Sequence, residues 1–221
     1  MLAAMTLKLH HFFILTEPGA ACAQYLSAIG LNEGSSNNHP GQGTANRRFF
    51  FANTTLELLY LSDAQEAETG RASRLRFGER ASKADASPFG LIVSETPGHE
   101  TDSEPSSFSN WLYCPEYFEA DQCFRVGTNS DLLSEPLCIC MPDNLPVSAS
   151  ALPVGNPDWV LSELRISLPV KQVSSVLQSF ANCDGVTLIL NQPQCLELTF
   201  NRFRTGQTKD FRPDLPLGLH W

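Results

Sequence analysis

Hydrophobic and polar positions along the chain follow short, strand-like and helix-like spacings. Residues 7–16 (LKLHHFFILT) are apolar and aromatic over a short length, which predicts a strand. Residues 20–30 place apolar side chains at helical spacing and end on a glycine, as helices often do. Residues 47–53 and 54–61 predict two more strands that meet at a tight turn containing Asn53.

A shorter version of this pattern returns near the end of the chain. Residues 160–169 predict a strand, and residues 170–180 predict a helix with one apolar face. Residues 186–192 and 194–200 predict a hairpin. We therefore expect two similar strand-helix-strand units, because repeated architecture in one chain indicates related modules.

The region between these units predicts a different organisation. Residues 62–86 are charged and compatible with helices, and short strand-like runs follow before a Pro-rich stretch at 142–158. We expect three parts: 1–61 as a first module, 62–158 as an insertion with extra strands and a Pro-rich linker, and 159–221 as a second module with a tail.

Composition narrows the classes of partner. The chain has 221 residues, 42% hydrophobic content and a net charge of −9. Nucleic acids and anionic membrane surfaces attract basic proteins, so neither is expected as a partner. No apolar run approaches the ~20 residues of a membrane span. The first 15 residues lack an early basic residue, and Lys8 and two histidines interrupt them, which argues against a signal peptide. We expect a cytoplasmic protein.

The seven cysteines lack the spacing of a metal site. No CxxC occurs, and the Cys138-x-Cys140 pair is too close for a zinc knuckle. Most of them lie in apolar runs. Reduced, buried thiols are therefore expected, as is usual in the cytosol.

Two Leu-Glu-Leu segments carry the candidate chemistry. Each places a glutamate, Glu57 or Glu197, inside an apolar strand. Because an unpaired ionised carboxylate is costly in an apolar interior, each needs water, a partner or a metal. When the first strands of the two units are aligned, His11 and Glu163 occupy equivalent positions. Glu57 and Glu197 are likewise equivalent on the last strands. One imidazole and three carboxylates would form an N/O site suited to Mn²⁺, Fe²⁺, Ni²⁺, Zn²⁺ or Mg²⁺.

Each of these residues also has a plainer interpretation. His11 is equally consistent with a strand histidine satisfied by its neighbours, and a register slip of one residue would make His10 the ligand. Nearby arginines predict simple ion pairs, Arg47 or Arg48 with Glu57 and Arg202 or Arg204 with Glu197. Glu163 is also consistent with a side chain that faces water beside Arg165.

The segment HPGQGTAN lacks the GK[ST] ending of a phosphate loop, so its glycines predict a tight loop. Asn46 and Arg48 have the same parity on the strand that follows. They are candidates to face a cleft and orient a polar or anionic substrate.

The segments LHHFFILT, YLSAIGL, HPGQGTANRRFFF and TTLELLYL together resemble the glyoxalase-like branch of the vicinal oxygen chelate superfamily. That superfamily includes glyoxalase I, extradiol dioxygenases and bleomycin-resistance proteins. The resemblance implies an α+β fold of paired βαβββ modules that form an incomplete barrel around a cleft, here with an abbreviated second module. It also implies a divalent metal, and carries the ligand positions onto His11, Glu57, Glu163 and Glu197.

Two functions follow from this resemblance. The first is a metal-dependent lyase, isomerase or dioxygenase that acts on a small oxygen-rich molecule. The alternative is a metal-free protein of the same fold that sequesters a small molecule. Exposed edge strands in such sheets also allow a homodimer.

Overall fold

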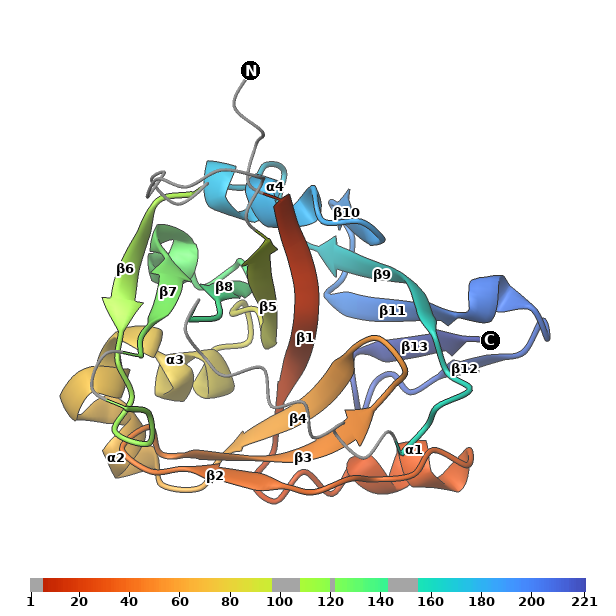
Figure 1. The fold of residues 1–221 in the computed structure, drawn as a ribbon, viewed down its shortest axis with the longest axis horizontal. Coiled ribbons are helices and arrows are strands. Elements are labelled where there is room, and N and C mark those ends of the chain that lie inside the picture. The colour runs from red at the N-terminus through yellow and green to blue at the C-terminus, as the bar shows by residue number, and fades with distance from the viewer. Residues whose placement is uncertain (1–5, 97–107, 120–121, 143–154) are drawn as a thin grey trace.

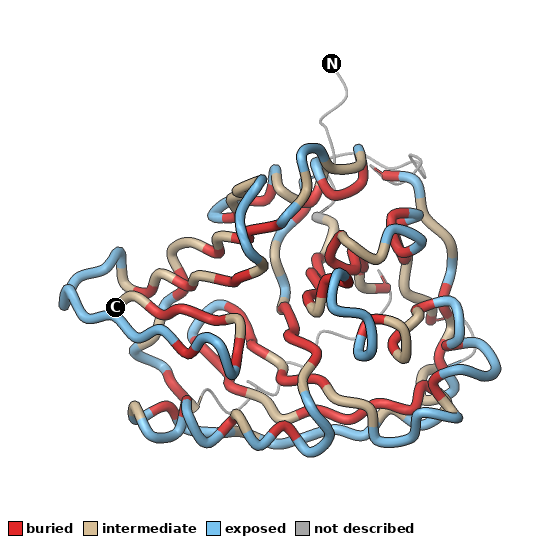
Figure 2. Tube along the Cα trace, turned by 180° about the vertical axis from the view of Figure 1, so that it is seen from behind, coloured by how far each residue is buried: buried red, intermediate tan, exposed pale blue. Residues whose placement is uncertain are grey.

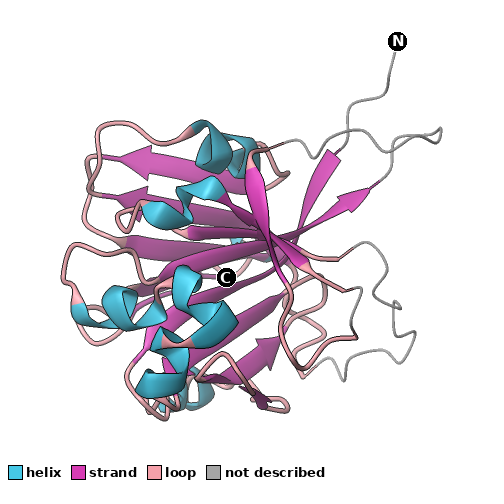
Figure 3. Cartoon of the chain, turned by 90° about the vertical axis from the view of Figure 1, so that its left-hand side faces the viewer, coloured by secondary structure: helices cyan, strands magenta, loops and turns pink. Residues whose placement is uncertain are grey.

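The computed structural model describes residues 6–96, 108–119, 122–142 and 155–221, and these form a mixed α+β fold (Figure 1). A curled sheet of eight strands and a second sheet of five strands make up most of it. The helices are few and short, as Figure 3 shows. The α+β class predicted from the sequence is confirmed. No helix in the described part is long and apolar enough to cross a membrane.

The large sheet has the strand order β2-β3-β4-β1-β5-β8-β7-β6. Strand β1 is parallel to β4 and antiparallel to β5, and β5 is parallel to β8. The strands are β1 (Thr6–Thr16), β2 (Asn37–His39), β3 (Thr44–Phe50), β4 (Thr55–Leu61), β5 (Phe89–Thr96), β6 (Asn110–Tyr113), β7 (Phe124–Gly127) and β8 (Leu137–Cys140).

The second sheet has the order β10-β9-β11-β13-β12. Its strands are β9 (Leu161–Leu168), β10 (Val186–Leu190), β11 (Cys195–Phe200), β12 (Thr208–Asp210) and β13 (Leu217–His220). The helices are α1 (Ala23–Ala28), α2 (Ala64–Glu68), α3 (Phe77–Ser82) and α4 (Ser175–Ala181), with 3-10 turns at Gly70–Leu75, Thr128–Asp131 and Asn201–Phe203.

Alternation along β1 divides the core between the two faces of the large sheet. Phe12 and Ile14 join a cluster that includes Leu164 and Leu198 of the second sheet. The neighbouring Phe13 joins a separate cluster on the opposite face. Successive side chains of a strand point to opposite faces, so one face packs on the second sheet and the other lines the inside of the curl. Buried segments accordingly run through both layers (Figure 2).

The strands predicted around 47–61 form the expected antiparallel pair, with Phe50 opposite Thr55. The hairpin predicted at 186–200 is wrong. Strand β9 lies between β10 and β11, parallel to β10 and antiparallel to β11. The connection through α4 returns the chain parallel to β9, as strand-helix-strand crossovers do, and this keeps β10 and β11 apart.

The region expected as an insertion supplies half of the large sheet. Strands β5 to β8 lie within 62–158 and extend the sheet from β1. Helices α2 and α3 contact each other and the inner face, where Phe77 lies 6.2 Å from the Phe13 ring. The Pro-rich linker lies mostly outside the described residues.

Candidate functional site

A cavity of about 470 Å³ lies on the inner face of the curled sheet. Side chains from strands at both ends of the strand order reach it, because the curl brings their inner faces toward one centre. Its apolar walls comprise Phe13, Phe50, Leu59, Leu75, Phe77, Ile92, Tyr113, Tyr117, Phe118, Phe124, Ile139 and Met141. Its polar residues are His10, His11, Asn37, Asn38, His39, Gln42, Arg48, Thr55 and Glu57. The cavity is therefore largely aromatic with polar groups concentrated on β1 to β4.

Strand pairing explains why the polar side chains meet. Arg48 of β3 lies directly opposite Glu57 of β4, and Glu57 lies beside Phe13 of β1. Asn46 is two residues from Arg48 and so points to the same face. The predicted positions His11, Glu57, Asn46 and Arg48 thus gather on one side of the large sheet, and all but Asn46 line the cavity.

Glu57 is the carboxylate of this group. Burial raises its pKa to about 7, while Arg48 and the Asn46 side chain oppose that rise. Asn46 is fully buried and its Nδ2 completes no hydrogen bond of good geometry within the described residues, although its Oδ1 accepts from Asn37 N at 2.8 Å. The Asn46 amide therefore lies beside a carboxyl group that changes charge near neutral pH.

The histidines around Glu57 are uncharged at neutral pH. Nδ1 of His10 and Nδ1 of His11 are 2.8 Å apart, so one donates a hydrogen bond to the other. Burial lowers the pKa of His11 well below its usual value, and neighbouring His10 and Arg48 lower it further. Burial also lowers the pKa of His39 to about 4. These imidazoles offer hydrogen bonds without adding positive charge.

Arg48 is partly occupied by the loop that precedes β2. Its Nε donates to the Ser35 carbonyl at 2.6 Å, and Nη2 donates to Ser35 Oγ at 2.8 Å. Its guanidinium also lies over the Phe50 ring, 4.9 Å from the centroid. Arg48 therefore holds the loop before β2 in place, and its guanidinium also brings a positive charge to the cavity.

A hydrogen-bonded clamp joins the two ends of the large sheet. Tyr113 and Tyr117 donate through their hydroxyls to Oε1 of Gln42, at 3.0 and 3.2 Å. Gln42 Nε2 donates to Thr44 Oγ1 at 2.8 Å, and Thr44 Oγ1 is 2.9 Å from His39 Nδ1. Burial raises the pKa of both tyrosines, which keeps their hydroxyls as donors. The clamp links the β2–β3 turn with the β6–β7 connection.

The clamp residues escaped the sequence analysis. The tight loop predicted for HPGQGTAN is present, and its Gly41 and Gly43 adopt positive φ. A Cβ on Gly43 would lie 2.2 Å from the Asp63 carbonyl oxygen, so the close approach requires glycine. His39 and Gln42, which share that loop with the glycines, carried no signal because their partners Tyr113 and Tyr117 are distant in sequence.

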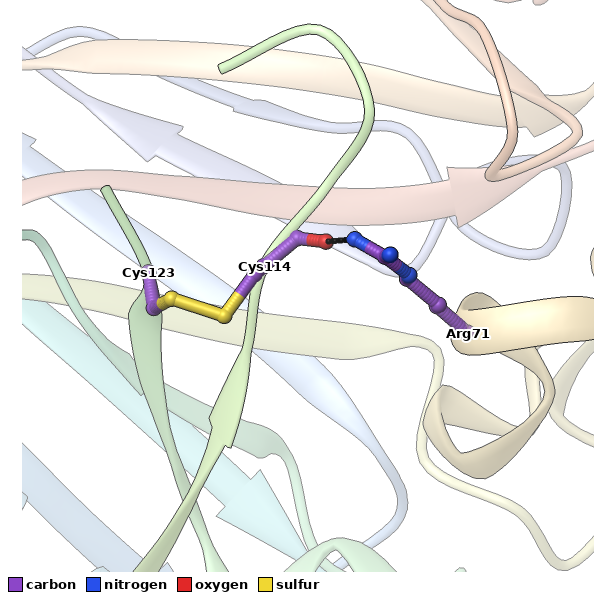
Figure 4. The surroundings of a disulfide bond; sticks show 3 residues. All are labelled: Arg71, Cys114 and Cys123. Carbon is purple, nitrogen blue, oxygen red and sulfur yellow. Dashed lines mark hydrogen bonds between the residues drawn. A yellow bond between two sulfur atoms is a disulfide. The ribbon is translucent and has the colours of Figure 1, made fainter. Parts of the chain in front are cut away.

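The connection between β6 and β7 contains a disulfide. Cys114 and Cys123 are bonded to each other, and Arg71 Nη1 donates to the Cys114 carbonyl at 3.3 Å (Figure 4). The expectation of reduced thiols is wrong for this pair, because the hairpin brings both residues together where its two strands end. The other five cysteines are free, and all but Cys22 are buried.

Glu163 and Glu197 lie outside the cavity. They alternate with Leu164 and Leu198, which pack toward the large sheet, so both glutamates face away from it. Arg165 lies between them, 3.3 Å from Glu163 and 3.6 Å from Glu197. The expected cluster of His11, Glu57, Glu163 and Glu197 is therefore corrected: the inner face receives the first two and the outer face of the second sheet receives the others.

The residues present do not fit a metal centre. Within the described ranges no three His, Cys, Asp or Glu side chains come together in an arrangement that could hold an ion. Histidine and carboxylate ligands commonly number three or more at metal sites. His11 and Glu57 supply two, and the nearby positions are Ile92 of β5, Ile139 of β8 and Met141 directly after β8.

Comparison with known proteins supports the fold alone. A hypothetical protein from Staphylococcus aureus has a similar crystal structure, with a TM-score of 0.61 and 8% identity over 98% of this chain and 99% of that one. The hypothetical protein BH1468 from Bacillus halodurans C-125 matches with a TM-score of 0.39 and 13% identity, over 61% of this chain and 93% of that one. No protein-family profile and no curated protein matches the chain.

Proposed function

We propose that this protein binds a small, partly aromatic molecule in the cavity of the curled sheet, without the help of a metal ion. The observation that carries the proposal is the cavity itself, whose volume of about 470 Å³ lies within the range of sites for small organic ligands. Aromatic walls supply most of the contact area that such ligands bury, and a few polar groups fix their orientation.

The polar side chains determine how such a ligand would orient. Its ring would pack among Phe13, Phe77 and Tyr113, and its polar group would face His11 and Glu57. The imidazoles are uncharged, and Glu57 near its pKa offers either a donor or an acceptor. This arrangement suits a hydroxyl, carbonyl or carboxylate substituent on the ring.

We further propose that the fold follows the vicinal oxygen chelate arrangement, with a revised pairing of modules. The order β2-β3-β4-β1 is repeated as β6-β7-β8-β5 across the β1–β5 junction. Both halves pair their first and last strands in parallel. In this proposal residues 6–61 and 89–141 are the two modules, and residues 159–221 form an added unit packed on the outer face.

This pairing gives a physical reason for preferring metal-free binding over the metal-dependent lyase, isomerase or dioxygenase expected from the resemblance. The first module presents His11 and Glu57 to the cavity. The corresponding part of the second module presents Ile92 of β5, Ile139 of β8 and Met141 directly after β8, which cannot ligate a hard cation. One half of an N/O ligand set is therefore replaced by an apolar wall.

Thermal unfolding with a fluorescent aromatic probe tests the proposal. Anilinonaphthalenesulfonate at saturation should raise the melting temperature by roughly 5 °C through mass action, equally with and without a chelator. Addition of Mn²⁺, Ni²⁺ or Zn²⁺ alone should leave it unchanged. A rise that requires one of these metals would overturn metal-free binding.

Two tryptophan variants locate the probe. Met141→Trp fills part of the cavity, so this variant should lose the rise in melting temperature. Leu112→Trp changes an exposed position of β6, so this control should keep the rise. Equal shifts in both variants would mean that the probe binds elsewhere.

A further inference from the structure

We propose that the Cys114–Cys123 disulfide controls ligand binding by holding two residues of the cavity wall, so that its reduction weakens binding. This inference rests on the proposed function, because it concerns the regulation of the same cavity. It assigns a role to a cysteine pair that lies outside the polar group around Glu57.

The disulfide lies at the base of the segment that forms one wall. Cys114 directly follows β6 and Cys123 directly precedes β7. Between them, Tyr117 and Phe118 both line the cavity. The bond therefore fixes the two ends of the connection that carries these two aromatic side chains.

The wall depends on where this connection lies. The Tyr117 ring is 5.6 Å from the His39 ring, and its hydroxyl donates to Gln42. The Phe118 ring is 4.9 Å from that of Phe124 on β7. The Tyr117 contacts reach across the cavity to β2 and the β2–β3 turn, so a displaced connection would open the wall on this side.

The disulfide is accessible to exchange. Both Cys114 and Cys123 are partly exposed, whereas four of the five free cysteines are buried. Thiol–disulfide exchange requires access of an attacking thiolate to sulfur. A dithiol reductant would transfer two electrons and two protons, leaving two cysteine thiols and its own disulfide, while the buried cysteines would not take part.

Reduction should loosen the wall without unfolding the sheet. The ladder between β6 and β7 still pairs Tyr113 with Phe124 next to the disulfide. Removing a cross-link restores conformational freedom to the residues that it enclosed. Tyr117 and Phe118 would then sample positions outside the cavity, and a ligand would have to order them again on binding.

The test compares probe affinity in the two redox states of the full chain. Dithiothreitol should raise the dissociation constant for anilinonaphthalenesulfonate at least fivefold, and reoxidation should restore it. The Cys114→Ser/Cys123→Ser variant should bind weakly with or without dithiothreitol. Cys22→Ser, which removes the partly exposed free thiol, should respond as the unaltered protein does. Equal affinities in the oxidised and reduced states would overturn the proposal.

A second variant separates the wall from the sulfur chemistry. Gln42→Met removes the acceptor for Tyr117 without touching a cysteine, so it should weaken binding even in the oxidised state. If the double serine variant fails to fold, reduction of the unaltered protein, with its circular dichroism recorded, supplies the same comparison.

A readout without any probe distinguishes the two proposals. Amide hydrogen exchange at residues 114–119 should accelerate on reduction, while exchange in β1 and β4 stays unchanged. Failure of the oxidised protein to bind the probe would refute the proposed function. Unchanged exchange on reduction would refute the control by the disulfide, whatever the probe does.

Discussion

Glu57 is the residue on which most of the electrostatics depends. Its carboxyl faces the cavity, and burial raises its pKa from 4.5 to about 7. Arg48 directly opposite and Asn46 nearby lessen that rise without cancelling it. The carboxylate within the first Leu-Glu-Leu segment is thus accommodated by partial protonation and by access to the cavity.

The raised pKa of Glu57 predicts a specific pH dependence of stability. Between pH 4.5 and 7 the unfolded chain releases the Glu57 proton while the folded chain keeps it, so stability falls as pH rises through this window. One pKa unit corresponds to about 1.4 kcal/mol, which gives an upper bound of about 3.5 kcal/mol for the loss. Glu57→Gln should remove this loss, and the variant should be more stable than the unaltered protein at pH 8.

Denaturant unfolding at several pH values measures the effect. Glu197→Gln is the matched control, since that glutamate also lies in a Leu-Glu-Leu segment but pairs with Arg165 at the surface, where both side chains are partly exposed. Such surface pairs contribute less than about 1 kcal/mol, so the control should keep the slope between pH 4.5 and 7. Identical slopes in unaltered protein and Glu57→Gln would contradict a raised pKa.

At the scale of elements, a buried glutamate connects the two layers. Glu135, in the turn before β8, accepts hydrogen bonds from Ser174 N at 2.6 Å and from Ser174 Oγ at 2.7 Å. Ser174 is the N-cap residue of α4. Asn129 donates to the same carboxylate at 3.0 Å, so the large sheet and the added unit share this network.

Removal of this carboxylate should be strongly destabilising. Glu135→Ala removes the acceptor of the Ser174 amide and one of the acceptors of Asn129 Nδ2, which keeps the Pro136 carbonyl at 3.0 Å. A loss of roughly 2–4 kcal/mol in the free energy of unfolding is expected. Asp131→Ala, at an exposed acidic position in the preceding turn, should change stability by less than about 0.5 kcal/mol. A similar effect of both substitutions in chemical denaturation would show that the network is not what joins the layers.

The strands differ in how far the sequence predicts their pairing and their buried face. Apolar and aromatic content over a short length predicted β1, β3 and β4, and the pairing of β3 with β4 follows from the short turn between them. The shared parity of Asn46 and Arg48 predicted that these two side chains lie on one face. The same reasoning identified β9 and β11 as strands but not which of their faces meets the large sheet. Strand periodicity is symmetric between faces, and only packing on another layer distinguishes them.

The remaining parts of the site depend on contacts between distant segments. Gln42 lies in a glycine-rich turn, and its partners Tyr113 and Tyr117 lie some 70 positions later. The Cys114–Cys123 pair depends on the β6–β7 hairpin bringing two strand ends together. No local spacing in the sequence encodes either contact. The sequence therefore predicts β1, β3 and β4, which carry most of the polar groups of the cavity, but not the wall that the β6–β7 connection forms.

For the whole molecule, the curl of the large sheet creates the cavity on its inner face, and the second sheet packs against its outer face. The Gln42 clamp and the disulfide-bonded connection bring the ends of the strand order together around the cavity. Packing of Phe51 against Phe200, with ring centroids 4.7 Å apart, holds the supporting sheet on the outer face. His11 and Glu57 therefore face the cavity, whereas Glu163 and Glu197 lie on the outer face of the second sheet.

Chemical-shift mapping tests the central claim, which is binding on the inner face without a metal. Amide spectra of the oxidised protein would be recorded during titration with anilinonaphthalenesulfonate in the presence of a chelator. We predict saturable shifts at Phe13, His39, Glu57 and Tyr113, with none around Glu163 and Glu197. Shifts confined to the outer face of β9 and β11, or shifts that appear only after addition of a divalent metal, would contradict the account.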